Sequence, residues 1–476
     1  MEVANLEPRV QAKVSAPSSE AEMAKEVFLK QKAFFNSNGT LDVSYRIAQL
    51  KKLSAAIEKY EEELYAAFAS DFKKGKVNTY MSEVSLVKAD IKYYLANTKK
   101  FAKRKLVGTN LANLPALSYT IAEPLGNAFI VGAWNYPFQL TFSPLVASIA
   151  AGNVNIVKPS GTTKEVSRVM AKIINETFPE EYMWCVEGRG DIVEKIMSNP
   201  FDKVFFTGSP RVGREIMALA APHLSNVTLE LGGKSPAVFT KGGINSVNMQ
   251  RIVWGKFFNA GQTCIAPDYF LVPRSEEKRF IEMAKEKIQT VVGDYKTSEF
   301  YCQIASERHL ERFAQIIPKD KVVYGGEINR ELRMLEPTIC TGVTLDDELM
   351  KDEIFGPIMP ILLYDSIEEA IQIVKKFPKP LSFHYYIGSD GPLKRRLISE
   401  IPSGSGCINE SLMFMTNHNL PFGGVGNSGM GQYHGKAGFD NFSNTKAVLD
   451  KPSWFELPVK YIPYTSWKEF VVKNLL

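Results

Sequence analysis

Cys264 occupies a position from which a thiol could act as a nucleophile. Residues 252–258 show helical apolar spacing, and Gly261 interrupts that pattern ahead of the strand-like run 269–272. The sequence therefore predicts Cys264 on a turn between a helix and a strand, where a small side chain can face a cleft. A lone cysteine is weak support for catalysis, because free cysteines are usually buried and inert.

A second segment strengthens the chemical interpretation. Glu230 lies in the apolar run 227–231, directly before Gly232 and Gly233. Burial raises the pKa of a carboxyl group and disfavours its charged form, so a glutamate in such a strand is usually paired or used as an acid or base. A thiol nucleophile together with a carboxyl group that can act as a base is typical of enzymes that use covalent catalysis.

The run Glu-Leu-Gly-Gly-Lys-Ser-Pro at 230–236, followed by Gly-Gln-Thr-Cys at 261–264, resembles the NAD(P)-dependent aldehyde dehydrogenase superfamily. Segments 261–269 and 424–436 are most similar to the class 3 enzymes. The resemblance extends over nearly the whole chain, through segments 124–126, 134–138, 157–160, 206–209, 353–357 and 420–426. It implies an α/β aldehyde dehydrogenase fold, with a Rossmann-like cofactor domain, an α/β catalytic domain and a β bridging and oligomerisation element.

The resemblance also implies a mechanism. Cys264 would attack an aldehyde to give a thiohemiacetal, whose hydride leaves for the nicotinamide, and water activated by Glu230 would hydrolyse the remaining thioester. Asn135 matches a side-chain oxyanion donor, worth about 3 kcal/mol of barrier; from the sequence alone it could equally cap a turn before Pro137. A free thiol, with a pKa of about 8.5, is mostly protonated at pH 7, so a lowered pKa or a base is needed.

The segment 206–214 is the candidate phosphate site. Ser209 suits an N-cap and Pro210 the first helical position, so a helix should begin there with free N–H groups that can bind a pyrophosphate. Gly208 and Gly213 belong to the same turn. No GxGxxG motif is present, and an ordinary capped helix is the alternative.

Other cofactor contacts follow from the resemblance. Glu353 matches the residue that binds the nicotinamide ribose, Phe355 packs near the nicotinamide, and Gly232 and Trp134 are further candidates for the cofactor site. The same resemblance implies a homodimer that oxidises medium- and long-chain aliphatic or aromatic aldehydes. Four aromatic or imidazole side chains are candidates for an apolar substrate tunnel: Trp134, Tyr136, Phe414 and His418.

Cofactor choice rests on Gly161. Family members commonly carry Glu at that position, where it binds the adenosine ribose hydroxyls and repels a 2′-phosphate. Without this carboxylate, Lys158 is left as a cation for either a hydroxyl or a phosphate. We therefore predict that NADP is accepted, with NAD as the other possibility.

Composition excludes several classes. A formal charge of +5 over 476 residues, without a basic run, gives no reason to expect a nucleic-acid partner. The five cysteines form no CxxC pair, so we expect reduced thiols in a cytoplasmic compartment and no bound metal. Residues 1–30 are too charged for a signal peptide, the C-terminus lacks an apolar tail, and the uncharged stretch 124–157 contains Pro and Gly that argue against a membrane span.

The pattern along the chain predicts two domains. Residues 41–105 should form long surface helices, and strands and helices then alternate from 128 to 231 as in a parallel, dinucleotide-binding sheet. The expected divisions are 1–22, a polar extension; 23–105 and 128–231, the cofactor domain; 232–417, the catalytic domain; 106–127 and 436–452, the bridging element; and 453–476, a C-terminal tail.

Three alternatives stay open. A CoA-acylating relative would pass the thioester to CoA, yet such enzymes usually lack a Glu at the position of Glu230. A non-catalytic protein retaining the fold is disfavoured by the presence of Cys264, Glu230 and Asn135. A cysteine hydrolase leaves the nucleotide-binding half unexplained.

Overall fold

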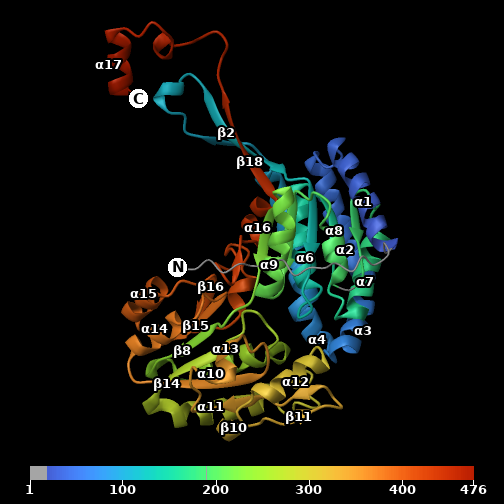
Figure 1. Cartoon of the computed structure of the whole chain (residues 1–476), viewed down its shortest axis with the longest axis vertical. Coiled ribbons are helices and arrows are strands. Elements are labelled where there is room, and N and C mark those ends of the chain that lie inside the picture. Colours follow the sequence, from blue (N-terminus) through green and yellow to red (C-terminus); the bar gives the residue numbers. More distant parts are fainter. Residues whose placement is uncertain (1–18, 189, 476) are drawn as a thin grey trace, which may run out of the picture.

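A computed structural model describes residues 19–188 and 190–475. Two sheets, each covered by helices, form the body, and an arm projects from it (Figure 1). Most of the predicted extension 1–22 lies outside the described residues.

The first sheet has the predicted parallel core. Its order is β17-β7-β6-β3-β4-β5, and all neighbours are parallel except β17, which runs antiparallel to β7. The bounds are β3 (Asn127–Val131), β4 (Val154–Lys158), β5 (Met183–Cys185), β6 (Lys203–Thr207), β7 (Asn226–Glu230) and β17 (Gly429–Met430). The alternation of strands and helices that the sequence predicts from 128 to 231 is confirmed to within a residue or two at most ends.

Side chains of this sheet alternate between two cores. Phe129 and Val131 pack with α1 (Ser19–Asn36), α8 (Asp191–Ile196) and α9 (Pro210–Ala220), whereas Ala128 and Ile130 belong to the main core on the other face. That face is covered by α2 (Val43–Lys59), α5 (Ser85–Phe101), α6 (Gln139–Ala151), α7 (Lys164–Asn175) and α16 (Gly435–Asn441). Helix α6 is buried along its whole length, which accounts for the uncharged stretch. Among the described residues, no helix is both long and apolar enough to cross a bilayer.

The region 41–105 is less superficial than predicted. Between α3 (Glu61–Phe72) and α5 the chain forms α4 (Lys76–Thr79) and a π-helical turn, η1 (Tyr80–Val84). Glu83 in that turn and Asp90 in α5 are buried. These helices pack on α6 and α7. Their sequence has an amphipathic pattern typical of surface helices, and that pattern does not indicate which charged side chains face inward.

The second sheet has the order β10-β13-β14-β9-β8-β15-β16, with only the edge strand β10 antiparallel. Its strands are β8 (Pro236–Phe239), β9 (Tyr269–Pro273), β10 (Val322–Tyr324), β13 (Thr338–Cys340), β14 (Ile358–Tyr364), β15 (Ser382–Tyr386) and β16 (Ser405–Ile408). The helices of this half are α10 (Ser246–Phe257), α11 (Glu277–Val291), α12 (Glu307–Ile316), α13 (Glu348–Lys351), α14 (Ile367–Lys375) and α15 (Gly391–Glu400). A small hairpin, β11 (Ile328–Asn329) and β12 (Met334–Leu335), lies beside it.

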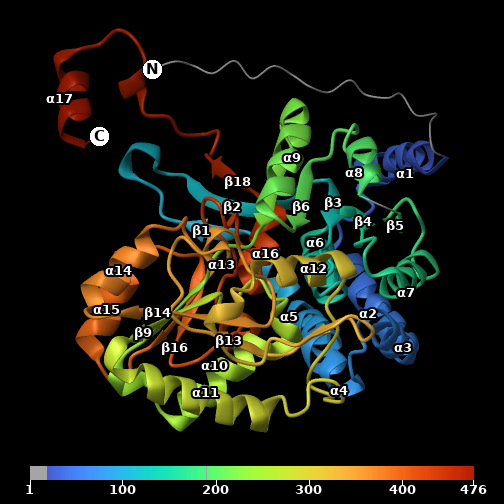
Figure 2. The ribbon, with the colours of Figure 1, turned by 60° about the horizontal axis from the view of Figure 1, so that its bottom comes forward.

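The arm is an antiparallel sheet of β1 (Lys105–Val107), β2 (Leu117–Pro124) and β18 (Ser443–Asp450). The strand predicted at 117–122 is therefore present, and it pairs with a segment more than 300 residues later in the chain. Beyond β18, the chain continues to α17 (Ser466–Leu475) at the far end of the arm, away from both sheets (Figures 1 and 2).

Candidate active site

Cys264 lies on the predicted turn between α10 and β9. The helix ends at Phe257, and Asn259 and Ala260 then take left-handed conformations, with φ of 54° and 52°. Gly261 follows at φ 71°, where a Cβ would lie 2.4 Å from the carbonyl oxygen of Gly356. The break therefore begins before Gly261, at residues whose type does not announce it.

Asn135 is tied to the loop that carries Cys264. Its side-chain Nδ2 donates to the carbonyl oxygen of Gln262 at 3.1 Å, and the side chain of Asn259 donates to the carbonyl oxygen of Asn135 at 3.0 Å. Asn135 is only 4% exposed. These two bonds hold the amide beside the cysteine loop, and they use one of its two N–H groups.

A second bond joins the same two segments. The hydroxyl groups of Tyr136 and Thr263 are 2.6 Å apart, and both residues are buried. The pKa of Tyr136 lies well above its usual value because the phenol is buried. The residues next to Asn135 and Cys264 are thus connected directly.

Glu230 ends β7 and is 3% exposed. Neither oxygen of its carboxyl group has a hydrogen-bond partner among the described residues. Burial raises the pKa of this carboxyl well above its usual value. An orphaned, buried carboxyl group of this kind is energetically costly unless something else uses it.

Cys264 and Glu230 interact electrostatically. Burial raises the pKa of the Cys264 thiol, and the carboxyl groups of Glu353 and Glu230 raise it further. Of the two expected ways to obtain a thiolate, a lowered pKa is therefore not seen here. The remaining way is a base acting on the thiol.

Glu353, Gly232, Phe355 and Trp134 also meet at this place. The carboxyl group of Glu353 lies against Gly232, and burial raises its pKa to about 8. The rings of Trp134 and Phe355 are 5.3 Å apart, edge to face, and His309 lies 5.0 Å from Trp134 on another side. Sequence reasoning missed His309, which has no motif around it.

The loop of Glu353 is held by charged groups that sequence reasoning also missed. Lys234 pairs with Asp268 at 2.5 Å inside the protein, and Asp268 accepts a bond from the amide of Ile354. Arg312 donates to the carbonyl oxygens of Glu353 and Ile354, both at 2.7 Å. Two of these groups could have been found from the sequence, because Lys234 lies in the motif at 230–236 and Asp268 lies four residues after Cys264.

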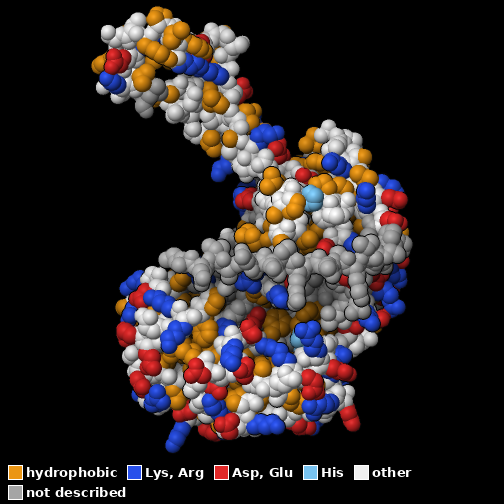
Figure 3. Space-filling model, viewed as in Figure 1, with side chains coloured by type: hydrophobic (Ala, Val, Ile, Leu, Met, Phe, Trp, Pro, Cys, Tyr) orange, Lys and Arg blue, Asp and Glu red, His pale blue; other side chains and the backbone are white. Residues whose placement is uncertain are grey.

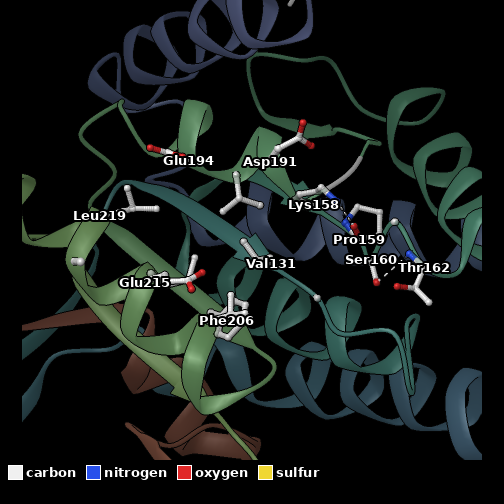
Figure 4. A pocket seen from close by; sticks show the side chains of 17 residues that line it. Val131, Lys158, Pro159, Ser160, Thr162, Asp191, Glu194, Phe206, Glu215 and Leu219 are labelled. Carbon is white, nitrogen blue, oxygen red and sulfur yellow. Dashed lines mark hydrogen bonds between the residues drawn. The ribbon is translucent and has the colours of Figure 1, made fainter. Parts of the chain in front are cut away.

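A cavity of about 860 Å³ opens along the carboxyl ends of β3, β4 and β6 (Figure 4). Lys158, Ser160, Gly161 and Thr162 line one end of it, and Figure 4 shows Asp191 and Glu194 facing Glu215 and Leu219 across it. Nζ of Lys158 donates to the carbonyl oxygens of Pro159 and Gly188, and burial lowers its pKa. The position and size fit a dinucleotide at the edge of a parallel sheet.

The predicted phosphate turn has the expected form. Ser209 caps α9 by accepting from the amide of Val212, with Pro210 at the first helical position. Gly213, however, faces the sheet, since a Cβ there would lie 2.8 Å from the side chain of Leu231. Val212 and Phe206 line the cavity, whereas Gly208, Ser209 and Gly213 do not.

The four tunnel candidates do not form one group. Tyr136 is bonded to Thr263, Trp134 lies with Phe355, Phe414 stacks on Phe422, and His418 stacks on Tyr93. His418 also pairs with Asp90 at 2.9 Å. Within residues 19–188 and 190–475, no cluster of His, Cys, Asp or Glu could hold a metal ion, and all five cysteines are free.

Comparison with known proteins agrees with this geometry. Residues 3–448 match the model of the aldehyde dehydrogenase family. A 4,4′-diaponeurosporen-aldehyde dehydrogenase of Staphylococcus aureus is 42% identical, over 92% of this chain and 96% of its own. A dimeric, NADP-preferring aldehyde dehydrogenase of Canis lupus familiaris is 37% identical, over 90% of this chain and 94% of its own.

Solved structures give the same result. The substrate-bound Staphylococcus aureus AldH superposes with a TM-score of 0.92 at 41% identity, over 94% of this chain and 98% of that one. An NAD⁺ complex of a Bacillus cereus aldehyde dehydrogenase gives 0.81 at 27% identity, over 91% of this chain and 89% of that one. The fold, the sequence and the arrangement around Cys264 lead to one conclusion: this chain belongs to the aldehyde dehydrogenase family.

Proposed function

We propose that this enzyme oxidises medium- and long-chain aliphatic or aromatic aldehydes to carboxylic acids through a thioester on Cys264. The observation that carries the proposal is the meeting of three groups: a thiol on a turn, an orphaned buried carboxyl group on Glu230, and the Asn135 amide tied to the thiol's own loop. Two relatives support the substrate class by their names: one is a 4,4′-diaponeurosporen-aldehyde dehydrogenase, and another is a member of aldehyde dehydrogenase family 3.

In the first step the thiol of Cys264 loses its proton to Glu230 and attacks the carbonyl carbon of the aldehyde. Asn135 donates its second N–H to the oxygen that becomes negative, because the first N–H is held by Gln262. When bound, the nicotinamide would supply the acceptor for a hydride. Loss of that hydride from the thiohemiacetal carbon leaves a thioester on Cys264.

Glu230 first releases to solvent the proton that it took from Cys264. In the last step it takes a proton from water, and the resulting hydroxide adds to the thioester carbonyl. The C–S bond then breaks, the carboxylic acid leaves, and Cys264 recovers its proton. The raised pKa of Glu230, which burial causes, makes its carboxylate a stronger base than an exposed one and so suits it to this proton transfer.

The cofactor proposal is NADP or NAD. Lys158 uses two of its three N–H groups on carbonyl oxygens, which leaves one for a ribose hydroxyl or a phosphate at the same end of the cavity as Gly161. Gly161 presents no carboxylate to repel a 2′-phosphate. Glu353, Phe355 and Trp134 are the proposed contacts of the nicotinamide half, and Gly232 leaves room for the Glu353 carboxyl group. The start of α9, after Gly208 and Ser209, is the proposed phosphate end, because Val212 of its first turn lines the cavity.

We also propose a homodimer. Apolar side chains of the arm and tail lie exposed, among them Trp454 at 79% and Ile462 at 78%, and Figure 3 shows hydrophobic side chains gathered on the projecting tail. Such a surface on a segment that touches neither sheet calls for a partner. Light scattering on the chain and on a version ending at Asp450 tests this: the shortened chain should be monomeric or dissociate more readily, and an unchanged mass and dissociation would contradict it.

The proposed division of the chain follows the predicted boundaries, with one addition. Strand β17 returns to the first sheet after the catalytic half, so residues 429–430 are assigned to the cofactor domain. Five free cysteines are consistent with a cytoplasmic location, which we propose on that basis.

Absorbance at 340 nm, with decanal and benzaldehyde and with each cofactor, tests the function. The parent should form reduced cofactor and acid, and Cys264→Ala should not. Adding CoA should neither be required nor divert the product to an acyl-CoA; formation of acyl-CoA would support the acylating alternative. Failure to reduce either cofactor with either aldehyde would refute the proposal.

A further inference from the structure

A buried ion pair lies behind the active site and has no part in the chemistry described so far. Nζ of Lys74 is 3.6 Å from Oε1 of Glu83, and the two side chains are 1% and 0% exposed. Neither of these two atoms makes a hydrogen bond among the described residues. The pair is therefore removed from water, and its two charged atoms attract each other without forming a hydrogen bond.

Such a pair is not a good way to stabilise a protein. The desolvation of two charges often exceeds their attraction, and well-packed apolar side chains of similar volume are frequently as stable. The chain also forms a π-helical turn, Tyr80–Val84, to carry Glu83, and π turns are uncommon and concentrated at functional sites. Both features call for a role other than packing.

Glu83 connects to the segment of Asn135. Its Oε2 accepts a hydrogen bond from the amide of Gln139 at 2.8 Å, where α6 begins. The first N–H groups of a helix have no partners within the helix, so a carboxylate there fixes the helix start and the dipole favours it. Asn135 lies four residues before that point in the chain.

Lys74 connects to the same segment from another side. Its Nζ lies 4.9 Å from the centre of the Tyr136 ring, a distance at which a cation is attracted to the ring face. The hydroxyl of Tyr136 in turn bonds Thr263, the residue before Cys264. The two charges thus both contact the segment that follows Asn135, Glu83 at the helix start and Lys74 at the Tyr136 ring.

We propose that Lys74 and Glu83 are positioning residues that set the Asn135 amide against the carbonyl oxygen bound at Cys264. This inference rests on the proposed function, since it gives Asn135 the role of oxyanion donor. It requires both charges, because Glu83 holds the segment at Gln139 and Lys74 holds it at Tyr136. Neither residue touches the substrate.

The test uses a paired replacement, because removing one charge alone would leave the other buried and could unfold the protein. Lys74→Met with Glu83→Gln removes both charges and keeps similar volumes. A matched control is Lys203→Met, another buried lysine, which lies at the start of β6 and bonds Asn226, Thr228 and Asn441. Thr263→Val removes the last contact of the proposed chain.

Two readouts separate positioning from general damage. One is the single-turnover rate of cofactor reduction with benzaldehyde. The other needs no cofactor: release of p-nitrophenolate from p-nitrophenyl acetate, as the Cys264 thiolate attacks the ester and the phenolate leaves. We expect the paired variant to slow both by about tenfold to a hundredfold, with KM changed less than about threefold.

We expect its melting temperature to stay within about 3 °C of the parent. Adding Thr263→Val to the paired variant should cost much less than it does in the parent, since the contact is already lost. Rates within about twofold of the parent, or fully additive effects, would overturn the inference. An inactive parent would instead refute the proposed function, which keeps the two failures distinct.

Discussion

Glu353 and Gly232 are in direct contact: a Cβ built on the glycine would lie 1.9 Å from Oε2 of Glu353. The amide of Gly233 also bonds this carboxyl group and holds its pKa below what burial alone would give. The Glu353 carboxyl group therefore lies against the chain just after β7, the strand that ends at Glu230. It can lie there only because Gly232 has no side chain.

The first prediction concerns this contact. Gly232→Ala should push the Glu353 carboxyl group aside and weaken cofactor binding by about tenfold, because a shift of one ångström at a positioned group is costly. Titration of cofactor against intrinsic fluorescence measures the dissociation constant. Gly108→Ala is the control, since a Cβ there meets nothing within 4 Å. Equal affinity in the Gly232 variant and the control would contradict the account.

The second prediction concerns the thiol. Because burial, Glu353 and Glu230 all raise the pKa of Cys264, its thiolate should form only at alkaline pH in the absence of cofactor. The rate of iodoacetamide labelling of the Cys264 peptide should keep rising above a pH of about 9. Glu230→Gln should shift that profile to lower pH, since it removes one negative charge. A plateau below about pH 8 in the parent would show a lowered pKa instead.

The third prediction concerns cofactor choice. Gly161→Glu should place a carboxylate at the end of the cavity beside Lys158, and so raise KM for NADP about tenfold or more while KM for NAD falls. Gly161→Gln is the matched control, because it adds the same bulk without the charge. The argument from Gly161 fails if the two variants show the same ratio of KM values.

Much of this architecture could be predicted from the sequence. The runs 128–131 and 204–206 are apolar throughout, as is typical of buried parallel strands, and the turn around Cys264 is bounded by a helical and a strand-like pattern. The positions of Cys264, Glu230 and Asn135 near one another follow from the family resemblance, and the hydrogen bonds and electrostatic coupling place them together.

Other features depend on contacts that periodicity does not report. The left-handed Asn259 is held by its side chain, which donates to the carbonyl oxygens of Asn135 and Gln262, and Glu83 of the π turn contacts Lys74 and the start of α6. Gly213 reads as part of a phosphate turn but serves helix-to-sheet packing. Each of these depends on a contact with another element, such as that of Asn259 with Asn135 or that of Glu83 with Gln139, which a local pattern cannot contain.

The fourth prediction is a stability effect of Lys203. This lysine is buried, and burial lowers its pKa to about 7 from the usual 10.5. Between these values the unfolded chain binds a proton that the folded chain does not, so this group makes the protein more stable as pH rises through that window and imposes a constant cost below it.

Lys203→Met should therefore show a smaller rise in the urea midpoint between pH 7 and pH 10 than the parent does. The exposed Lys278→Met is the control for a general effect of lost charge. An identical pH dependence in the parent and in Lys203→Met would mean that Lys203 stays protonated in the folded protein.

The fifth and most direct test addresses the thioester itself. Glu230→Gln, mixed with decanal and oxidised cofactor at alkaline pH, where the Cys264 thiol ionises without a base, should give one equivalent of reduced cofactor per active site and then almost stop. Mass spectrometry should find the decanoyl group on the Cys264 peptide, at close to one per site. Steady turnover at the parent rate, or a burst without acylated Cys264, would contradict the proposal that Glu230 drives hydrolysis of a Cys264 thioester.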